Sequence, residues 1–362
     1  LLGAVVGIVL GVGLGWVIVY ALRDQGLSSF SVPISSTVSI LIMAFVIGVL
    51  AAVGTSLVTP LQAQGKETSI KVMTYNVYKG GLGRKQPLSQ TAKVIQDAKA
   101  DVVGLQELNT RSDPKNAEKL AELLVFNRAG SVLTRYEIVE EKRYGIKVKL
   151  PSGQEAYIFN LHLSSNPYQP YQLMGIQPKF KGHKDTPFIK TEAEAIEEAQ
   201  KTRTHGTTLK RLFHMMGGID KNIPVFVVGD FNEPSHLDWT EATANAGRHP
   251  MKVEFPNSLT MAQAGFVDAY RTVYPDEMEK PGFTWTPLKK ADDPTIHHDR
   301  IDYVYFKGEG LKVTDAKVIG ESKENADIVV APYPSDHRAV VATITFAKQT
   351  KSGKPEKQEA DK

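Results

Sequence analysis

The chain contains a series of short apolar segments that end in polar residues, and this pattern limits the fold more than any other feature. Residues 70–77 alternate in polarity and are rich in β-branched side chains, which is typical of a strand. Residues 101–105 and 223–228 are short runs of strand length. Burying such strands requires no polar group at their ends. The pattern therefore predicts a sheet-based domain that carries functional groups at one rim.

The polar side chains at these strand ends are carboxylates, carboxamides and imidazoles: Asn76, Glu107, His162, Asp230, Asn232, Asp302, Asp336 and His337. A hard cation such as Mg²⁺ prefers oxygen ligands and keeps water and substrate phosphate oxygens among them. Imidazole groups titrate near neutral pH and suit proton transfer or phosphate contact. Together these residue types favour a Mg²⁺ site with acid–base groups beside it.

The composition excludes several other chemistries. The 362-residue chain has no cysteine, which removes disulfides, thiolate zinc sites and cysteine nucleophiles. Any metal ion must then be held by oxygen or imidazole. The formal net charge of +3 is too small to argue for a nucleic-acid partner by itself.

Residues 1–65 differ from the rest because Arg23 and Asp24 are their only charged residues. Residues 1–22 and 39–58 are apolar runs long enough to cross a bilayer. The alternative is a signal peptide with its core at residues 40–53 and a cleavage site near residues 61–63. We therefore expect a membrane-anchored or secreted protein that contacts the membrane through residues 1–58, with the following domain outside the cytoplasm.

Residues 66–346 are expected to form one domain. Helical spacing is present in residues 88–98, 117–125 and 191–216, where Thr191 and Glu194 predict a capping box. Further strands are predicted at residues 131–139, 144–150, 156–163, 301–306 and 339–346. Mixed elements in this order predict two packed sheets with helices outside. Residues 347–362 are charged and almost without apolar side chains, which predicts a disordered tail.

Six segments carry a resemblance to a known family: residues 73–77 (MTYNV), 103–107 (VGLQE), 160–163 (NLHL), 229–232 (GDFN), 299–303 (DRIDY) and 335–338 (SDHR). Their order resembles the endonuclease/exonuclease/phosphatase superfamily of DNase I-like phosphoesterases. This resemblance implies an α+β fold, a four-layered α/β sandwich of two mixed β-sheets flanked by helices. It also implies hydrolysis of phosphate esters with Mg²⁺, or with Mn²⁺ instead. Residues 10–53 separately resemble the last two membrane helices of FtsX-like ABC permeases.

The superfamily resemblance implies roles for the metal-binding residues. Glu107 matches the metal ligand, and Asn76 beside it either assists the metal or touches phosphate. Asp336 is expected to be a further metal ligand or to orient His337. The alternative for Glu107 is a solvated carboxylate at a strand end, and the alternative for Asp336 is a turn residue after Pro334.

The resemblance also implies the catalytic residues. Asp230 would orient or deprotonate the attacking water, and Asn232 would hold a phosphate oxygen, against the alternative of an Asx turn. His337 and Asp302 form the expected imidazole–carboxylate pair. His162 would contact the scissile phosphate or help the leaving oxygen, unless it is a satisfied structural histidine.

Residues of the loop between 283 and 300 are weaker candidates. Trp285 is expected either to shape the substrate pocket or to pack in the core. Arg300 is expected to bind phosphate or a site carboxylate, with a surface arginine as the alternative. We interpret His297 and His298 as solvated residues in preference to metal ligands.

The leading functional hypothesis is Mg²⁺-dependent hydrolysis of a phosphodiester or phosphomonoester substrate by in-line attack of water. A lipid phosphodiesterase or exported phosphatase fits the apolar segment better than a nuclease does. A nuclease should show a basic, aromatic surface, for which the candidates are Tyr168, Tyr171, Lys179, Lys181, Lys184 and Lys190. The competing class is a non-catalytic chain, either a membrane-anchored binding module or a permease fragment fused to this domain. No obligate protein partner is expected.

Overall fold

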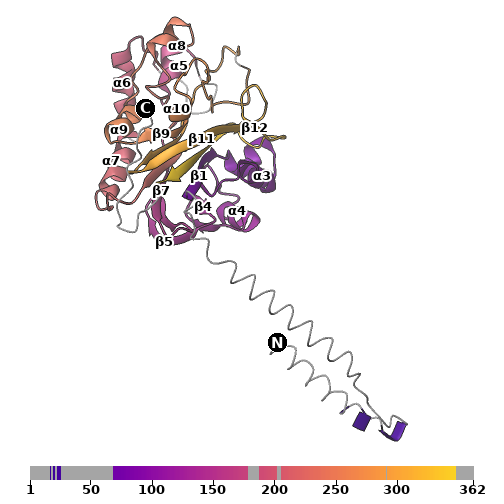
Figure 1. Cartoon of the computed structure of the whole chain (residues 1–362). Helices are drawn as coiled ribbons and strands as arrows, with labels where there is room; N and C mark the ends of the chain where they lie inside the picture. The colour runs from indigo at the N-terminus through magenta and orange to yellow at the C-terminus, as the bar shows by residue number, and fades with distance from the viewer. Residues whose placement is uncertain are drawn as a thin grey trace. The chain divides into compact units, whose positions relative to one another are not determined.

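The structure is a computed structural model that describes residues 17, 19, 20, 23–25, 68–177, 187–201, 205–290 and 292–347 (Figure 1). The chain divides into two units, Leu1–Lys66 and Glu67–Lys362. In the first unit the described residues include the short helix η1 (Arg23–Gln25). Within the described residues, no helix has the length and apolar character needed to cross a membrane. The predicted membrane or signal segments, and the predicted tail beyond Ala347, lie mostly outside the described residues.

Two mixed β-sheets form the centre of the second unit. The seven-stranded sheet has the spatial order β12 (Ile328–Val329), β11 (Leu311–Gly320), β13 (Ala339–Phe346), β1 (Thr68–Asn76), β2 (Val102–Gln106), β4 (Val132–Thr134) and β3 (Asn127–Ala129). The six-stranded sheet has the order β5 (Glu137–Lys142), β6 (Gly145–Lys149), β7 (Glu155–His162), β8 (Val225–Asp230), β10 (Asp302–Lys307) and β9 (Val267–Asp268).

Alternating side chains on β1 show how the sheets and helices are held together. Ile70 and Val72 are buried in the core between the sheets, where they join Ile158 and Phe226 of the six-stranded sheet. Met73, from the opposite face of β1, packs with the helical side of the molecule instead. Successive side chains of a strand point to opposite faces, so one strand contributes to two apolar cores.

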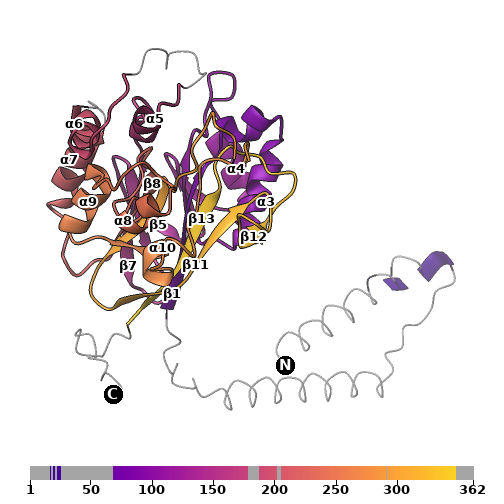
Figure 2. The ribbon, with the colours of Figure 1, turned by 90° about the horizontal axis from the view of Figure 1, so that it is seen from above.

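Helices cover the outer face of each sheet. The helices α3 (Leu88–Ala98) and α4 (Asn116–Leu124) pack on the seven-stranded sheet. The helices α7 (His205–Met216) and α9 (Pro256–Gln263) pack on the six-stranded sheet, with α6 (Glu192–Lys201) beside them (Figure 2). The remaining helices are η2 (Lys79–Arg84), α5 (Gln169–Met174), α8 (Glu241–Asn245) and α10 (Ala269–Val273).

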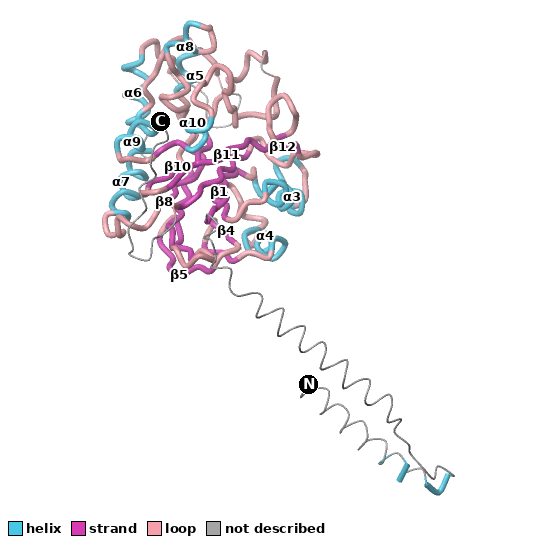
Figure 3. Tube along the Cα trace, viewed as in Figure 1, coloured by secondary structure: helices cyan, strands magenta, loops and turns pink. Residues whose placement is uncertain are grey.

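The layer order of the second unit is thus helices, sheet, sheet, helices, and Figure 3 shows the strands enclosed by helices on two sides. The predicted four-layered α/β sandwich is confirmed.

Two predicted elements divide in the structure. The strand expected at residues 131–139 is two strands, because β4 belongs to the seven-stranded sheet and β5 to the six-stranded sheet. The helix expected at residues 191–216 consists of α6 and α7, and residues 202–204 between them are not described. The capping box at its start is confirmed. The Glu194 amide donates to Thr191 Oγ1 over 3.2 Å, and the Thr191 amide donates to Glu194 Oε2 over 3.0 Å.

The strand registers bring the polar ends together at one rim. The strands β1 and β2 are parallel neighbours in which Asn76 pairs with Gln106. The strands β7 and β8 are also parallel and pair His162 with Asp230. The antiparallel strand β10 begins at Asp302, directly opposite Asp230. Strands that are distant in sequence therefore deliver their end groups to one place.

Candidate active site

Asn76 at the end of β1 connects two carboxylates. Its Nδ2 donates to Asp230 Oδ2 over 2.9 Å and lies 3.3 Å from Glu107 Oε1. Its Oδ1 accepts a hydrogen bond from the Tyr78 amide over 3.1 Å, which fixes the orientation of the amide group. The side chain thus presents its donor to the two carboxylates, and its expected role of assisting the metal or touching phosphate stays a prediction.

Glu107 follows β2 and is the most exposed carboxylate of the site. Its backbone has φ of 54°, in the left-handed region, so the chain turns sharply at the end of the strand. The side chain of Gln106 is held below it by a 2.6 Å hydrogen bond from Nε2 to Asn160 Oδ1. Because the preceding residue is buried and bonded to β7, Glu107 is placed at the rim of the cavity.

Asp230 at the end of β8 lies at the centre of the cluster. Only 1% of its surface is exposed, and its Oδ1 accepts the Asn232 amide over 2.9 Å. The Oδ2 atom is 3.6 Å from His162 Nε2 and 3.7 Å from His337 Nε2. Asn232 donates one Nδ2 hydrogen to the Leu163 carbonyl over 2.9 Å, which leaves its second Nδ2 hydrogen for another acceptor. One buried carboxylate thus lies within reach of two imidazoles.

Asp302 and His337 form the imidazole–carboxylate pair that the sequence predicted. His337 Nδ1 lies 2.9 Å from Asp302 Oδ2, and both side chains are buried. The Asp302 amide donates to Thr284 Oγ1, which holds the start of β10 against the neighbouring loop. The hydrogen bond between His337 Nδ1 and Asp302 directs the opposite ring nitrogen, Nε2, toward Asp230.

Burial and charge shift the pKa values of this pair. Burial raises the pKa of the Asp302 carboxyl, and the nearby His337 charge opposes that rise. Burial alone lowers the pKa of His337, but the charges of Asp302 and Asp230 and the hydrogen bond with Asp302 outweigh it and raise that pKa to about 10. The pair therefore favours a protonated imidazole next to carboxylates.

Asp336 adds a further acid to the site. Burial raises the pKa of its carboxyl to about 6, opposed by His337 and reinforced by the charges of Glu107 and Asp230. The side chain is partly buried and lies on the cavity wall. Burial is the main cause of the raised pKa, and the neighbouring carboxylates add to it; a bound cation would favour the charged form of Asp336.

Most of the predicted site residues line a cavity of about 390 Å³, and Asn76, Asp302 and Arg300 are not part of its lining. It is lined by Glu107, His162, Leu163, Ser164, Ser165, Tyr168, Tyr171, Asp230, Asn232, Trp285, Ile301, Asp336 and His337. Trp285, predicted to shape a pocket, is on this wall, with its ring centroid 4.9 Å from that of His337. The rim therefore combines acids, imidazoles and an aromatic wall around one space.

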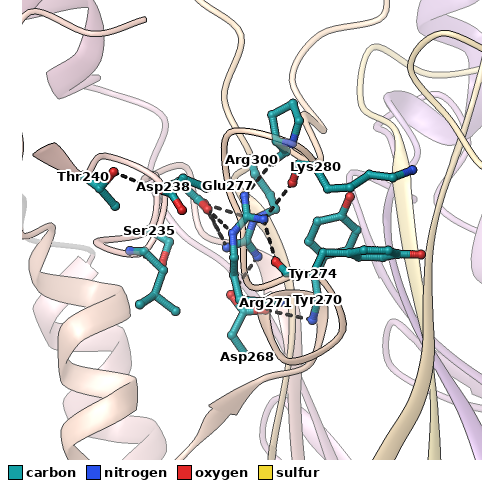
Figure 4. A network of polar contacts seen from close by, with 12 residues as sticks. Ser235, Asp238, Thr240, Asp268, Tyr270, Arg271, Tyr274, Glu277, Lys280 and Arg300 are labelled. Carbon is teal, nitrogen blue, oxygen red and sulfur yellow. Dashed lines mark hydrogen bonds and ion pairs between the residues drawn. The ribbon is translucent and has the colours of Figure 1, made fainter. Parts of the chain in front are cut away.

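Arg300 lies outside this cavity, in contrast to its predicted role in substrate binding. Its guanidinium is 1% exposed and donates to Asp238 Oδ2 over 3.0 Å and to Asp268 Oδ2 over 2.7 Å. Arg271 pairs with the same Asp238 in the network shown in Figure 4. These buried ion pairs occupy the guanidinium nitrogens of Arg300. The side chain therefore has a structural role in place of the predicted contact with substrate.

His297 was predicted to be solvated, and the structure corrects this interpretation. Its side chain is only 12% exposed, and its Nε2 lies 3.1 Å from His249 Nδ1. His298 is partly buried and its Nε2 lies 3.1 Å from the Lys290 carbonyl.

Several residues of the site were missed in the sequence. Tyr168 and Tyr171, considered only as a possible nucleic-acid surface, are buried in the cavity wall. Ser335 Oγ donates to the Asn76 carbonyl over 2.6 Å and ties the 335–338 segment to β1. The position of Ser335 next to Asp336 was the only available signal for it. The buried tyrosines gave no signal, because the short helix α5 and the segment around it have no periodic sequence pattern.

The donor set at the rim fits a divalent cation. Glu107 and Asp336 offer carboxylate oxygens to the cavity, next to the buried Asp230. Hard oxygen donors of this kind are typical of sites for small divalent cations. The site residues are thus compatible with the metal dependence that is typical of phosphoesterases of this fold.

This fold and this rim define a hydrolase of the phosphodiesterase and nuclease type. The family model described as "Endonuclease/Exonuclease/phosphatase family" matches residues 73–337, and the chain belongs to this family. The match does not extend to residues 10–53, whose resemblance to FtsX-like permeases stays a prediction.

Individual relatives are distant. The uncharacterized protein F14F9.5 of Caenorhabditis elegans is 26% identical over 312 residues, which cover 76% of this chain and 91% of that protein. The solved endonuclease/exonuclease/phosphatase from Beutenbergia cavernae DSM 12333 has 16% identity and a TM-score of 0.47, covering 77% of this chain and 72% of the other. Truncated Caenorhabditis elegans TDP2 has 19% identity and a TM-score of 0.44, and the match covers 77% of this chain and 98% of the other.

Proposed function

We propose that this protein hydrolyses a phosphate ester, a phosphodiester or phosphomonoester, with the assistance of Mg²⁺. The observation that carries the proposal is the position of Asp230. This buried carboxylate is hydrogen-bonded by Asn76 and lies within 3.7 Å of imidazole nitrogens of His162 and His337. A structural role at a strand end requires no such convergence of titratable groups.

Asp230 and His337 would prepare the attacking water. A water molecule at the cavity face of Asp230 can donate a proton toward the Asp230 carboxylate while its oxygen attacks phosphorus. Asp302 holds His337 through Nδ1, so the imidazole keeps its Nε2 directed at the reacting groups. As the new P–O bond forms, the bond to the leaving oxygen breaks, and the proton from water passes to the Asp230 carboxylate beside the protonated His337.

Amide and imidazole donors would hold the phosphate group. Asn232 lines the cavity and retains one Nδ2 hydrogen for a phosphate oxygen. His162 is 39% exposed and stands at the cavity wall, where a protonated ring can contact the phosphate or supply a proton to the leaving oxygen. These contacts strengthen as negative charge develops on the equatorial oxygens.

Glu107 and Asp336 are the residues that would hold the divalent cation. When bound, such a cation polarises the phosphate and neutralises charge on the departing oxygen. Asn76 would then act through its donor, by keeping the Glu107 and Asp230 carboxylates in place.

The proposal extends to location and substrate class. The apolar residues 1–58 support an exported or membrane-anchored enzyme, for which a lipid or another extracytoplasmic phosphate ester is the fitting substrate class. The partly apolar cavity wall of Tyr168, Tyr171, Trp285 and Ile301 is compatible with an organic group beside the phosphate.

The test is hydrolysis by the full chain of a panel of DNA, RNA, sphingomyelin, inositol phosphates and nucleotides, with Mg²⁺ and with EDTA. We expect hydrolysis of at least one phosphate ester with Mg²⁺ alone, and its loss in Asp230→Ala and His337→Ala. His214→Ala, a change at an exposed histidine on α7, is the matched control. Full activity in both site variants would contradict the assignment of the catalytic residues. A preference for DNA over the other substrates would show that the enzyme is a nuclease and that a lipid is not its substrate.

A further inference from the structure

A second cluster of histidine and aspartate lies outside the substrate cavity. His249 Nδ1 is 3.1 Å from His297 Nε2, and His297 Nε2 is 3.5 Å from Asp299 Oδ1. The three atoms all lie within 4.8 Å of one another. None of these residues is among the described residues that line the cavity. The proposed phosphate hydrolysis makes no use of them.

The orientation of His249 directs a lone pair at the centre of this cluster. Its Nε2 lies 3.2 Å from the Asp238 carbonyl oxygen, and only a protonated Nε2 makes a favourable contact there. The neutral ring then carries its lone pair on Nδ1, the atom that faces His297. A hydrogen bond from one ring nitrogen to a carbonyl is the usual arrangement behind a histidine that ligates metal with the other nitrogen.

The rings and the carboxylate are fixed by packing. Trp239, which is fully buried, stacks on His249 with ring centroids 4.1 Å apart and an interplanar angle of 9°. Its Nε1 donates to Asp299 Oδ1 over 2.8 Å, and Tyr168 OH donates to Asp299 Oδ2 over 2.6 Å. Three candidate ligands are therefore held in place before any ion binds, which lowers the cost of ordering them.

The charge of Asp299 lacks a strong partner. This carboxylate is 2% exposed, and among the described residues its only ion pair is with His297 at 3.5 Å. The nearest arginine in sequence, Arg300, is occupied by Asp238 and Asp268. A buried carboxylate is costly unless a cation compensates it.

We propose that His249, His297 and Asp299 bind a divalent transition-metal ion of the Zn²⁺ class. Ligands of a tetrahedral zinc ion stand roughly 3.3 Å apart when its bonds are about 2.0–2.1 Å long. The separations of 3.1 Å and 3.5 Å are close to that value. Two imidazoles with one carboxylate select Zn²⁺ over Mg²⁺, because Mg²⁺ prefers oxygen ligands. The partly exposed edge of His297 leaves an approach for the ion and for a fourth ligand.

The ion would stabilise one wall of the substrate cavity. Asp299 exchanges two main-chain hydrogen bonds with Trp285, each 3.0 Å long, and its carboxylate holds Tyr168. Both Trp285 and Tyr168 line the cavity. Metal binding at the second cluster therefore positions the aromatic wall without taking part in the chemical step.

The direct test locates the metal in the unaltered protein. Crystals of the full chain are prepared in excess Mg²⁺, soaked in Zn²⁺ and measured by anomalous scattering at the zinc absorption edge. We expect a zinc peak between His249, His297 and Asp299, whether or not zinc also enters the reaction centre around Glu107, Asp230 and Asp336. The proposal would be overturned if zinc peaks appeared only at the reaction centre or on the surface, with no peak at the second cluster.

A solution test uses matched variants. The full chain is stripped of metal and titrated with Zn²⁺ in a Glu107→Gln/Asp336→Asn background that weakens the reaction centre. We expect His249→Ala and His297→Ala each to bind about one zinc ion fewer per chain than that background. His298→Ala, the neighbouring histidine bonded to the Lys290 carbonyl, is expected to bind the same amount. Equal zinc binding in all variants would reject the site. If a variant fails to fold, the crystallographic test on the unaltered protein decides the question.

Discussion

Among the described residues of the domain, two clusters of histidine and aspartate differ in their ratio of acid to base. In the proposed reaction centre, the first cluster groups two carboxylates, Asp230 and Asp302, with His337. The second cluster has two imidazoles, His249 and His297, around Asp299. Excess carboxylate favours a protonated imidazole and hard cations nearby. Excess imidazole favours a neutral ring with a free lone pair, which suits a softer metal ion.

The two clusters also differ in the elements that carry them. Asp230 and Asp302 stand opposite each other on β8 and β10, so the sheet register fixes their separation. His249 and His297 lie in loops, and the stacked Trp239 fixes their rings instead. The comparison teaches that similar residue types can serve proton transfer in one place and metal binding in another, according to which type is in excess.

The largest expected effect is the loss of activity on removal of metal. Treatment with EDTA should lower phosphate-ester hydrolysis by about 10³-fold or more, because a divalent cation contributes several kcal/mol of charge stabilisation to the reaction. Addition of Mg²⁺ should restore most of kcat without zinc. Steady-state kinetics with metal-stripped protein measures this. If Zn²⁺ alone restores kcat and Mg²⁺ does not, the assignment of hard-metal chemistry to the reaction centre is wrong.

The second prediction tests whether the carboxylate of Asp302, in the first cluster, is needed for catalysis. Asp302→Asn should lower kcat by roughly 10²–10⁴-fold, since the carboxylate that orients His337 is lost and acid–base catalysis contributes about that much. KM should change little, because Asp302 lies beneath the cavity and is fully buried. The control is Asp97→Asn, which removes an exposed partner of Lys93 on α3. Equal kcat values for the two variants would show that the Asp302–His337 pair is structural.

The reaction centre could be predicted from the sequence because the sheet itself creates it. His162 and Asp230 end strands that are parallel neighbours, and Glu107 directly follows a strand that is parallel to β1, so these residues meet at one rim. The alternating and apolar strands also indicated the two sheets before the layers were known. Local pattern and strand topology suffice where every functional residue stands at a strand end.

The second cluster and the role of Arg300 could not be predicted in this way. His249 and His297 are separated by 48 positions and lie in loops without periodic pattern. Arg300 follows directly after a motif residue, yet Asp238, 62 positions earlier, determines where its guanidinium points. Such contacts depend on how loops pack on a completed fold, and loop packing leaves no mark in local sequence.

The third prediction concerns the support of the second cluster. Arg300→Leu should lower the free energy of unfolding by about 3–5 kcal/mol, because Asp238 and Asp268 lose a buried partner. Urea denaturation gives this value, and Arg128→Ala is the control. Arg128 pairs with Glu118 at the surface, where about 0–1 kcal/mol is expected. A variant with normal stability but a raised KM would return Arg300 to its predicted role in substrate binding.

The smallest effect tests how the lone carboxylate of the second cluster is held. Tyr168→Phe removes the hydroxyl that donates to buried Asp299 over 2.6 Å and keeps the ring in the cavity wall. The free energy of unfolding should fall by about 1–3 kcal/mol, the cost of leaving a buried acceptor short of a donor. The control is Tyr157→Phe, whose hydroxyl donates to the partly exposed Glu140 and should contribute roughly 0.5–1.5 kcal/mol to the free energy of unfolding. A smaller loss of stability in the Tyr168 variant than in the Tyr157 variant would show that the Tyr168 hydroxyl does not hold Asp299. The difference between Asp299, held by neutral donors, and Asp302, held by the His337 imidazole, would then lose its support.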